Sequence, residues 1–151
     1  MKISIHPLGP DLHSRCVTTD RELAKRLRCS FAAIVPAAEV FADHFYERIF
    51  AAAPSVRAMF PPDMREQKAK LLAALGWVVE HLEQGETLKA RLRELGQRHE
   101  RYGALPAHYP VVTDAMIGAM SDVAGPTWDA EIAADWRTAL ERVSDIMLGR
   151  D

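Results

Sequence analysis

One histidine of this chain, His99, is predicted to lie on the apolar face of a helix rather than in solvent. It belongs to the segment LGQRHERYGALPAHYP, which covers residues 95–110. The apolar side of this helix recurs at steps of three and four residues and contains Leu88, Leu92, Leu95, His99 and Tyr102. Because buried polar groups find partners, the imidazole is either a hydrogen-bonded core residue or the ligand of a metal.

Two other polar residues lie on predicted apolar helix faces. Gln67 comes one turn before Leu71 on the most apolar face of the chain, and Tyr46 follows Phe45 in the segment HFYERIF. Each has an ordinary alternative, because a first-turn glutamine is commonly half-exposed and a tyrosine commonly lies at the edge of a core. The three polar residues therefore predict a site only in combination.

Several other kinds of chemistry are not indicated. The sequence contains no GxGxxG, GxxxxGK[ST], HExxH or CxxC motif, and no catalytic triad or pair of carboxylates stands out. The formal net charge of −2 gives no general attraction to nucleic acid or acidic lipid. No apolar run approaches the roughly 20 residues that a membrane helix needs. We therefore expect neither a nucleic-acid partner nor a membrane partner.

Length and the N-terminal residues set the expected organisation. The 151 residues predict one domain, residues 18–151, after an irregular N-terminal arm, residues 1–17. The N-terminus lacks the apolar stretch of a secretory signal, which favours a cytoplasmic location. Cys16 and Cys29 are accordingly expected to be free thiols.

The apolar periodicity predicts an all-α fold of about seven helices. A first helix ends near Pro36, and another begins near Pro110. The remaining long helices are predicted over about 37–52, 64–83, 87–102 and 129–148. Gly85 is expected to interrupt the helical structure between two of them. The proline-rich segment AAAPSVRAMFPPD is expected to form short turns of helix and loop. The expected buried residues of the first two helices are Leu23, Leu27, Phe31, Ile34, Val40, Phe41, Phe45 and Ile49.

Three segments together resemble the globin family, specifically the bacterial single-domain globins and the globin half of flavohaemoglobins. They are HFYERIFAAAPSVRAMF, MREQKAKLLAAL and LGQRHERYGALPAHYPVV, in this order. Their aromatic residues, glutamine and histidine have the family's spacing and helical setting. The resemblance covers roughly residues 20–150. It implies a globin fold, a three-over-three helical sandwich that encloses haem b.

The resemblance also implies a role for each polar residue. His99 matches the proximal ligand of the haem iron, and Tyr46 and Gln67 match the distal tyrosine and glutamine. Tyr109 matches a proximal tyrosine that helps to orient the histidine. The family's proximal glutamate falls on Asp151, which is one methylene shorter and is the last residue, so we expect this part of the network to be incomplete.

The apolar residues that match haem contacts of the family are Phe45, Phe60, Leu71, Leu95 and Val112, and Phe60 has the position that stacks on the porphyrin. Lys70 and Arg98 are candidates to pair with the haem propionates, or they face solvent. If Gln67 swings away, Tyr46 or Lys68 could approach ferric iron.

These residue types suit the chemistry. Haem iron needs a neutral imidazole fixed in one tautomer, which a carbonyl or carboxylate on the other ring nitrogen provides. The Tyr46 hydroxyl and the Gln67 amide both donate hydrogen bonds. Because each bond to a charged partner contributes about 1.5–3 kcal/mol, a distal tyrosine and glutamine predict slow oxygen release.

Three functions stay open from the sequence. The first is a haem globin that binds oxygen and converts nitric oxide to nitrate, as flavohaemoglobins do with a fused reductase. Because no flavin or nicotinamide domain is recognisable in this chain, turnover would need a separate reductase. The second is oxygen storage, transport, scavenging or sensing without turnover. The third is a globin-like regulatory protein without haem.

The third function is disfavoured because four residues of the ligand site are all present: Tyr46, Phe60, Gln67 and His99. For the first two functions the expected ligands are oxygen, nitric oxide and carbon monoxide. The chain is expected to be a monomer or a homodimer.

Overall fold

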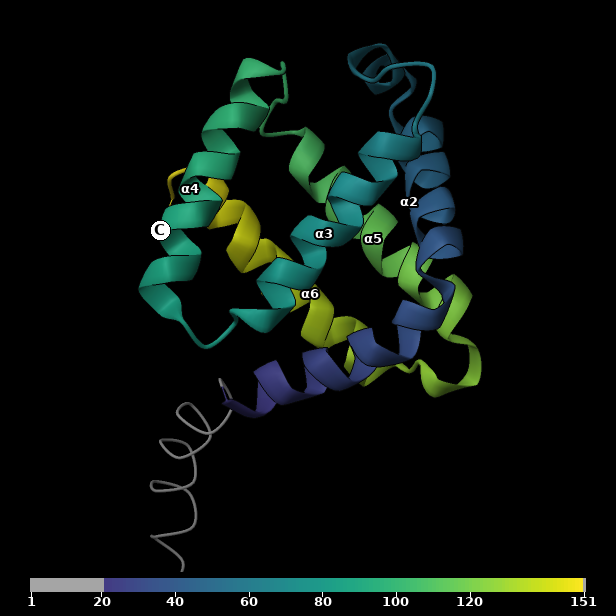
Figure 1. The fold of residues 1–151 in the computed structure, drawn as a ribbon, viewed down its shortest axis with the longest axis vertical. Coiled ribbons are helices and arrows are strands. Elements are labelled where there is room, and N and C mark those ends of the chain that lie inside the picture. Colours follow the sequence, from purple (N-terminus) through teal and green to yellow (C-terminus); the bar gives the residue numbers. More distant parts are fainter. Residues whose placement is uncertain (1–20, 151) are drawn as a thin grey trace, which may run out of the picture.

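The computed structural model describes residues 21–150, which form helices and turns without a strand (Figure 1). The first helix covers 21–34 and continues through a 3-10 turn, η1 (Val35–Ala37), into α2 (Ala38–Ala52). The later elements are η2 (Pro54–Met59), α3 (Arg65–Glu80), α4 (Gly85–Arg101), α5 (His108–Ala124), η3 (Gly125–Thr127) and α6 (Ala130–Met147). The predicted all-α class is confirmed. The predicted arm, residues 1–17, lies outside the described residues, as does Asp151.

The most deeply buried part of the core lies where α2 packs on α5. The buried side of α2 recurs every three or four residues and consists of Phe41, Ala42, Phe45, Tyr46 and Ile49. Ala119 and Met120 of α5 are fully buried against it. This packing fixes the position of α2, which is the helix that carries Tyr46.

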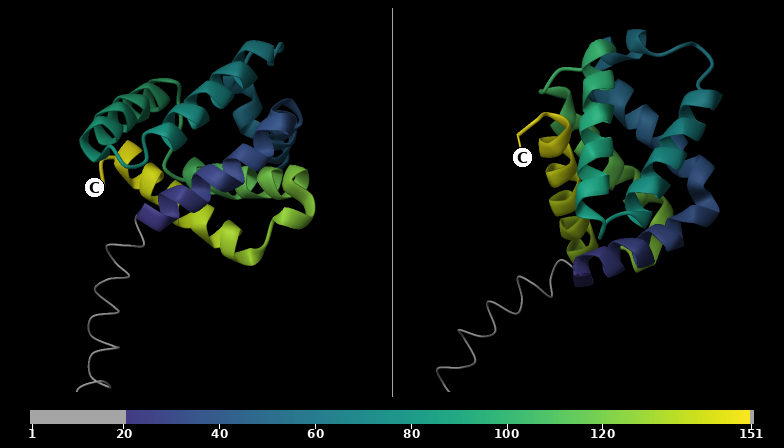
Figure 2. Two further views of the ribbon diagram at one scale, coloured as in Figure 1. Left: turned by 60° about the horizontal axis from the view of Figure 1, so that its bottom comes forward. Right: turned by 60° about the vertical axis from the view of Figure 1, so that its left-hand side comes forward.

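A second, smaller apolar cluster joins α4 to α6, which lie side by side in both views of Figure 2. Its buried members are Leu88 and Leu92 of α4 and Ile146 of α6. The helices approach closely at Gly96, where an added Cβ would collide with the backbone carbonyl of Met147. The absence of a side chain at position 96 therefore sets the distance of α4 from α6, and α4 carries His99.

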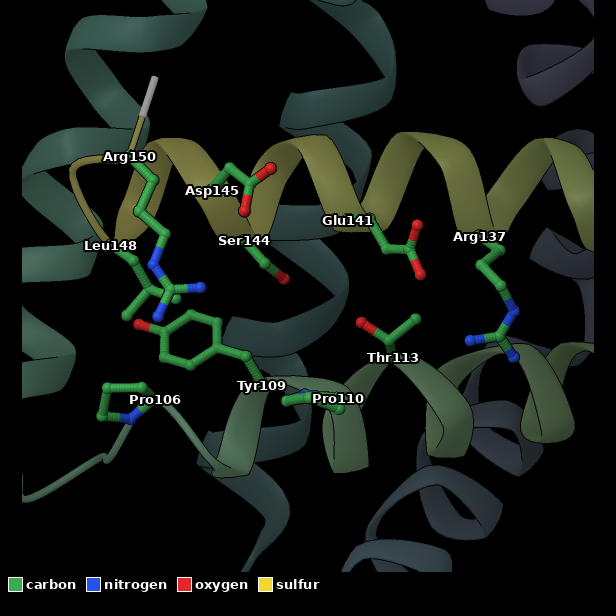
Figure 3. Close-up of a pocket in the computed structure, with 10 residues that line it drawn as sticks. All are labelled: Pro106, Tyr109, Pro110, Thr113, Arg137, Glu141, Ser144, Asp145, Leu148 and Arg150. Carbon is green, nitrogen blue, oxygen red and sulfur yellow. The ribbon is translucent and has the colours of Figure 1, made fainter.

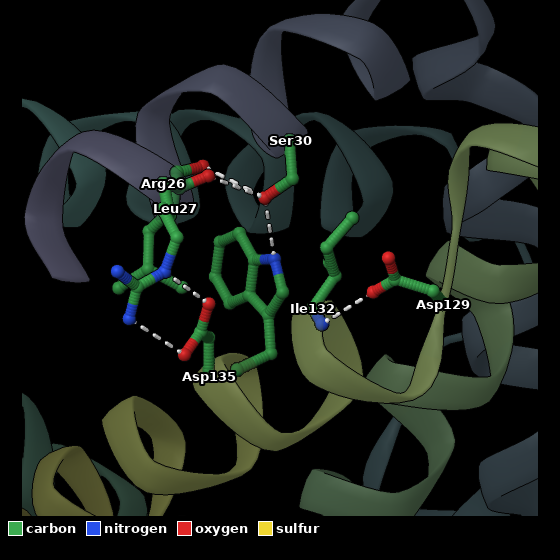
Figure 4. A network of polar contacts seen from close by, with 7 residues as sticks. Arg26, Leu27, Ser30, Asp129, Ile132 and Asp135 are labelled. Atoms are coloured by element: carbon green, nitrogen blue, oxygen red, sulfur yellow. Dashed lines mark hydrogen bonds and ion pairs between the residues drawn. The ribbon is translucent and has the colours of Figure 1, made fainter. Parts of the chain in front are cut away.

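Polar contacts attach the first helix to α6 (Figure 4). The Arg26 guanidinium donates to both carboxylate oxygens of Asp135, at 2.7 and 3.1 Å. The Trp136 indole N–H donates to the Ser30 hydroxyl at 2.9 Å. Asp129 caps α6 by accepting a hydrogen bond from the Ile132 N–H at 2.8 Å. The bonds of Arg26 and Trp136 join the two helices, whereas the Asp129 cap stabilises the start of α6.

The observed helices differ from the predicted ones mainly at their ends. α3 ends at Glu80 rather than near residue 83, and Gly85 is the first residue of α4 rather than a break between helices. Residues 81–84 make the turn instead. Within residues 21–150 no helix combines the length and apolarity needed to cross a membrane. Cys29 is an exposed free thiol, as expected, whereas Cys16 lies outside the described residues.

Two predicted apolar positions are exposed. Val40 is 48% exposed because it lies outside the buried side of α2, which consists of Phe41, Ala42, Phe45, Tyr46 and Ile49. Tyr102 is 69% exposed because α4 ends at Arg101 and the chain turns away before the predicted stripe is complete. Helical spacing alone thus misassigned one residue on a neighbouring face and one residue beyond a helix end.

The close approach at Gly96 gives a stability prediction. Gly96→Ala should lower the free energy of unfolding by about 1–3 kcal/mol, because the new methyl group meets a backbone carbonyl that cannot move independently of α6. Gly76→Ala is the matched control, since an added Cβ at this α3 position meets nothing within 4 Å. That control should be more stable than the wild type by about 0.5–1 kcal/mol. Urea unfolding measures both, and equal effects of the two substitutions would contradict the tight contact.

Candidate functional site

Tyr46 of α2 and Gln67 of α3 form a hydrogen-bonded pair. The Gln67 side-chain amide donates to the Tyr46 hydroxyl oxygen at 3.2 Å. Tyr46 is buried and Gln67 is half-buried. Burial raises the pKa of the Tyr46 phenol above its ordinary value, and the hydrogen bond from Gln67 opposes this in part. Because the bond from Gln67 uses a lone pair of the Tyr46 oxygen, the hydroxyl proton stays available for a further acceptor.

Aromatic rings surround the Tyr46 side chain. The ring of Phe45 meets it edge-on at a centroid distance of 4.9 Å, and that of Phe60 does so at 5.6 Å. Phe50 lies 5.9 Å away and also contacts Phe60. The sequence reasoning did not select Phe50, although its place one helical turn after Tyr46 was a signal for it. These rings hold the Tyr46 hydroxyl in one place within an apolar environment.

Arg57 of η2 organises the loop that presents Phe60. Its guanidinium donates to the carbonyl oxygens of Phe60 and Pro61, both at 3.1 Å, and of Pro62 at 3.3 Å. It also lies 5.1 Å from the centroid of the Phe50 ring. Arg57 is therefore a positioning residue for Phe60, and no motif in the sequence pointed to it.

On α4, the His99 ring has one nitrogen in a hydrogen bond, and its other nitrogen has no hydrogen-bond partner among residues 21–150. Its Nδ1 lies 2.9 Å from the carbonyl oxygen of Leu95, one turn earlier in the helix. When Nδ1 carries the proton and donates to this carbonyl, Nε2 presents its lone pair. The ring is half-buried, and the ring of Tyr102 lies 6.4 Å from it. This is the arrangement that a neutral histidine ligand requires.

The two polar groups, His99 on α4 and the Tyr46–Gln67 pair on α2 and α3, share no hydrogen bond in the described part of the chain. The apolar residues expected beside them are divided in the same way. Phe60, Leu71 and Val112 border the large core cluster, and Leu95 borders the small one. All four side chains are only partly buried. Apolar residues of both clusters thus keep surface that an apolar group could cover.

Tyr109 lies at the start of α5 and points toward the end of α6, next to Leu148 and Arg150 (Figure 3). Its ring lines two cavities, of about 160 and 280 Å³. Burial raises the pKa of the Tyr109 phenol, and the nearby Glu100 carboxylate raises it further. The predicted acid partner, Asp151, lies outside the described residues, so its role stays a prediction. In the structure the partner of His99 Nδ1 is the Leu95 carbonyl.

A comparison with protein families identifies the fold. The Globin family model matches residues 43–147, well over half of the chain. The chain belongs to the globin family. The resemblance seen in the sequence is therefore confirmed, and with it the helical globin fold.

Relatives of this globin include larger proteins. A flavohemoprotein of Rhodopirellula baltica is 31% identical over 117 residues, which are 76% of this chain and 29% of that protein. A flavohemoprotein of Rhizobium meliloti is 29% identical over 111 residues, which are 72% of this chain and 28% of that protein. The globin thus spans less than a third of the length of these relatives.

One solved structure matches this globin over most of its length. The crystal structure of a Pseudomonas aeruginosa PAO1 protein, described as structurally highly homologous to a human hemoglobin, matches with a TM-score of 0.75 and 29% identity. The match covers 85% of this globin and 97% of that chain. The helical framework around the candidate site is therefore that of a solved bacterial protein.

The lysine and arginine side chains near the candidate site have different partners. Lys68 pairs with Asp43 at 2.6 Å and Lys70 with Glu66 at 3.6 Å, so both ammonium groups are held by carboxylates. Arg98 lies 3.7 Å from Glu94 through its terminal nitrogen, but its Nε is buried without a hydrogen-bond partner among the described residues. Among residues 21–150, Arg98, which is next to His99, thus retains a buried donor for a further group.

Burial of the Tyr46 phenol gives a pH prediction. Since its pKa is higher in the folded than in the unfolded chain, the folded state retains the proton over a range where the unfolded state loses it. The resulting stability is complete below about pH 10 and is lost as the pH rises through the raised pKa. Tyr46→Phe should therefore show a shallower loss of stability between about pH 9 and 11 than the wild type.

Urea unfolding at several pH values measures this slope. Tyr102→Phe, which removes the hydroxyl of an exposed ring, is the matched control. Equal slopes for Tyr46→Phe and the wild type would show that the Tyr46 phenol is not shielded from water in the folded chain.

Proposed function

We propose that this globin binds haem b, with Nε2 of His99 as the iron ligand and with Tyr46 and Gln67 as hydrogen-bond donors to oxygen on the opposite face. The observation that carries the proposal is the pair of fixed polar groups. His99 Nδ1 is bound to a carbonyl 2.9 Å away, and Gln67 donates to Tyr46 at 3.2 Å among aromatic rings. One group suits a metal ligand, and the other suits a small polar ligand.

The surrounding residues fit the shape and polarity of haem, which is a flat apolar ring with acidic groups along one edge. Partly buried Phe60, Leu71 and Leu95 offer apolar surface to such a ring. The partnerless Arg98 Nε offers a donor to a carboxylate. Since no group of three His, Cys, Asp or Glu side chains in the described residues could hold a metal ion, a lone histidine ligand suits an iron whose other ligands come from a porphyrin.

When bound, haem supplies reversible binding of diatomic gases and one-electron redox chemistry. The protein's own residues do the rest. The Leu95 carbonyl fixes the tautomer and orientation of the His99 ring. The Gln67 amide holds the Tyr46 oxygen, which leaves the Tyr46 hydroxyl positioned so that it would donate a hydrogen bond to a diatomic ligand. Phe45, Phe60 and Leu71 exclude water, which strengthens that hydrogen bond.

We further propose that this globin oxidises nitric oxide to nitrate with electrons from a separate reductase. One nitric oxide and one oxygen molecule combine with one electron to give nitrate. A donor pair that retains oxygen favours reaction over delivery, because oxygen must still be present when nitric oxide arrives. The match to flavohemoproteins supports this function.

The first experiment is an absorption spectrum of the haem-loaded protein, oxidised, reduced, and reduced with carbon monoxide. We expect an intense Soret band that shifts with carbon monoxide, and we expect His99→Ala to lose most of it because the iron loses its protein ligand. His44→Asn is the control, since His44 pairs with Asp122 away from the site. Full haem retention by His99→Ala would remove His99 from its proposed role.

Nitric oxide consumption distinguishes turnover from storage. The reduced protein, kept reduced chemically in the presence of oxygen, should consume nitric oxide and release nitrate. Reversible oxygen binding without consumption would leave oxygen storage, transport, scavenging or sensing as the function. A folded protein that takes up no haem would leave the non-haem regulatory function.

The Tyr46 hydroxyl has a measurable effect on oxygen. Tyr46→Phe keeps the ring among its aromatic neighbours but removes the donor. Loss of one charge-assisted hydrogen bond of about 1.5 kcal/mol should speed oxygen dissociation about tenfold. Stopped-flow displacement of oxygen by carbon monoxide measures the rate, with Phe50→Leu as a control for changes in ring packing alone. An unchanged rate in Tyr46→Phe would show that another group holds the oxygen.

A further inference from the structure

Asp43 and Lys68 form an ion pair beside the Tyr46–Gln67 hydrogen bond, and both contacts join α3 to α2. The Lys68 Nζ lies 2.6 Å from the Asp43 Oδ1. Asp43 and Tyr46 are three residues apart and are therefore neighbours on one side of α2. Gln67 and Lys68 are consecutive in α3, so their side chains leave the helix in directions about 100° apart. Two attachments of this kind fix α3 against both sliding along α2 and rotation about its own axis.

The N-terminal half of α3 depends on such attachments, because apolar packing holds it less firmly than the C-terminal half. The buried residues of α3, Leu75 and Val79, both lie beyond its middle. Leu71 and Leu72, nearer its start, are only partly buried. Polar contacts with α2 therefore contribute more to the position of the N-terminal half, which is the half that carries Gln67.

A second carboxylate near Lys68 is already occupied. The Arg65 guanidinium binds both oxygens of Asp63, at 3.1 and 2.7 Å, and the Arg65 backbone N–H donates to this carboxylate at 3.0 Å. The pKa of the Asp63 carboxyl is lowered mainly by these hydrogen bonds, and the charge of Lys68 adds only a smaller effect. Lys68 is thus directed to Asp43 on α2 rather than to the loop before α3.

The ion pair is open to solvent. The side chain of Lys68 is 33% exposed and that of Asp43 is 51% exposed. Attraction between charges that water and ions can reach weakens as the salt concentration rises. The hydrogen bond between Gln67 and Tyr46 joins uncharged groups and has no such dependence of its own.

We propose that Asp43 and Lys68 position the Gln67 side chain, and that their ion pair makes the retention of oxygen sensitive to ionic strength. This inference rests on the proposed haem site. When the pair separates, the N-terminal half of α3 moves away from α2, and the Gln67 amide no longer reaches the Tyr46 oxygen. The Tyr46 hydroxyl then loses its fixed orientation, and its hydrogen bond to a diatomic ligand weakens. Asp43 and Lys68 act through the Tyr46–Gln67 bond rather than on the ligand.

The first test is the rate of oxygen dissociation from the reduced, haem-loaded protein, measured by displacement with carbon monoxide. Asp43→Ala should release oxygen about threefold faster than the wild type, as expected for the loss of one partly exposed ion pair. The effect should be smaller than that of Tyr46→Phe, because the hydroxyl donor is still present. Lys68→Met, which keeps the length of the side chain, should match Asp43→Ala. Acceleration by only one of these two variants would show that the pair itself is not responsible.

Glu66→Ala is the matched control. It also removes the carboxylate of an ion pair with a lysine of α3, but its partner, Lys70, lies on the same helix at 3.6 Å. Loss of this pair leaves the contacts between α2 and α3 intact, so the oxygen dissociation rate should equal that of the wild type. Equal acceleration by Glu66→Ala and Asp43→Ala would overturn the proposal, because any charge at the start of α3 would then have the same effect.

Salt provides a readout that a change in packing alone would not alter. The screening length falls from about 10 Å at 0.1 M salt to about 3 Å at 1 M. The wild type and Glu66→Ala should release oxygen faster as salt is added and approach the rate of Asp43→Ala, which should itself stay constant. A wild-type rate independent of salt, or an equal response in Asp43→Ala, would overturn the role of the ion pair.

A second measurement follows Gln67 directly. Nuclear magnetic resonance of the isotope-labelled chain, as purified and reduced under carbon monoxide so that any bound iron is diamagnetic, detects the Gln67 side-chain amide. Gln67→Leu identifies its signals by their loss. In Asp43→Ala these signals should move toward their values in Tyr46→Phe, which removes the acceptor of the hydrogen bond. Glu66→Ala should leave them unchanged.

This measurement separates failure of the inference from failure of the proposed function. If the amide signals move in Asp43→Ala although the wild type takes up no haem, the pair positions Gln67 and the proposed function fails. If the wild type binds haem and oxygen but the signals stay in place in Asp43→Ala, the proposed function stands and the inference is wrong. Signals that move without a change in oxygen dissociation would overturn the effect of the pair on oxygen.

Discussion

The separation of the core into two apolar clusters is the constraint on which the candidate site depends. α3 packs mainly on α2, and α4 packs mainly on α6, although Trp77 and Val78 at the C-terminal end of α3 also pack against the α4–α6 cluster. Leu71, nearer the N-terminal end of α3, borders the large cluster, whereas Leu95 of α4 borders the small one. Their partial burial is therefore the physical basis for binding an apolar group. Any such ligand stabilises the folded chain by an amount that grows with the logarithm of its concentration relative to its Kd.

Each polar group of the site is positioned by contacts that are independent of the other. The His99 ring is oriented by the carbonyl of Leu95 within α4, and the distance of α4 from α6 is set at Gly96. The Tyr46 hydroxyl is oriented by Gln67 and by the rings of its aromatic neighbours. Orienting contacts of this kind keep a ligand site ready before its ligand arrives. A change on one side can therefore alter that side alone, and the effects of distant substitutions should add.

The sequence predicted the parts of this structure that depend on helical periodicity and on family resemblance. It predicted the helices, the burial of Phe41 and Phe45, and the family. It could not predict contacts between residues distant in the chain. The collision at Gly96 depends on where the carbonyl of Met147 lies. The role of Arg57 is local in the chain, but it depends on a backbone bend that helical periodicity does not describe.

Helical periodicity also does not show at which residue a helix ends. Tyr102 continued the predicted stripe arithmetically, yet α4 had already ended, and its ring faces water. Val40 was assigned to the wrong face, because a single step along a helix turns a side chain by about 100°. Neither error affects the proposed ligand residues, which lie within the helices or next to a proline-rich bend.

In the loop after η2, the backbone carbonyls are hydrogen-bonded by a side chain rather than by backbone N–H groups. Pro61 and Pro62 have no N–H to donate, so the carbonyls of Phe60, Pro61 and Pro62 are held by the side chain of Arg57. A segment supported by one side chain opens at a lower free energy than the helices on either side of it. This loop is therefore expected to admit a protease or to exchange its amide protons before the neighbouring α2 and α3 do.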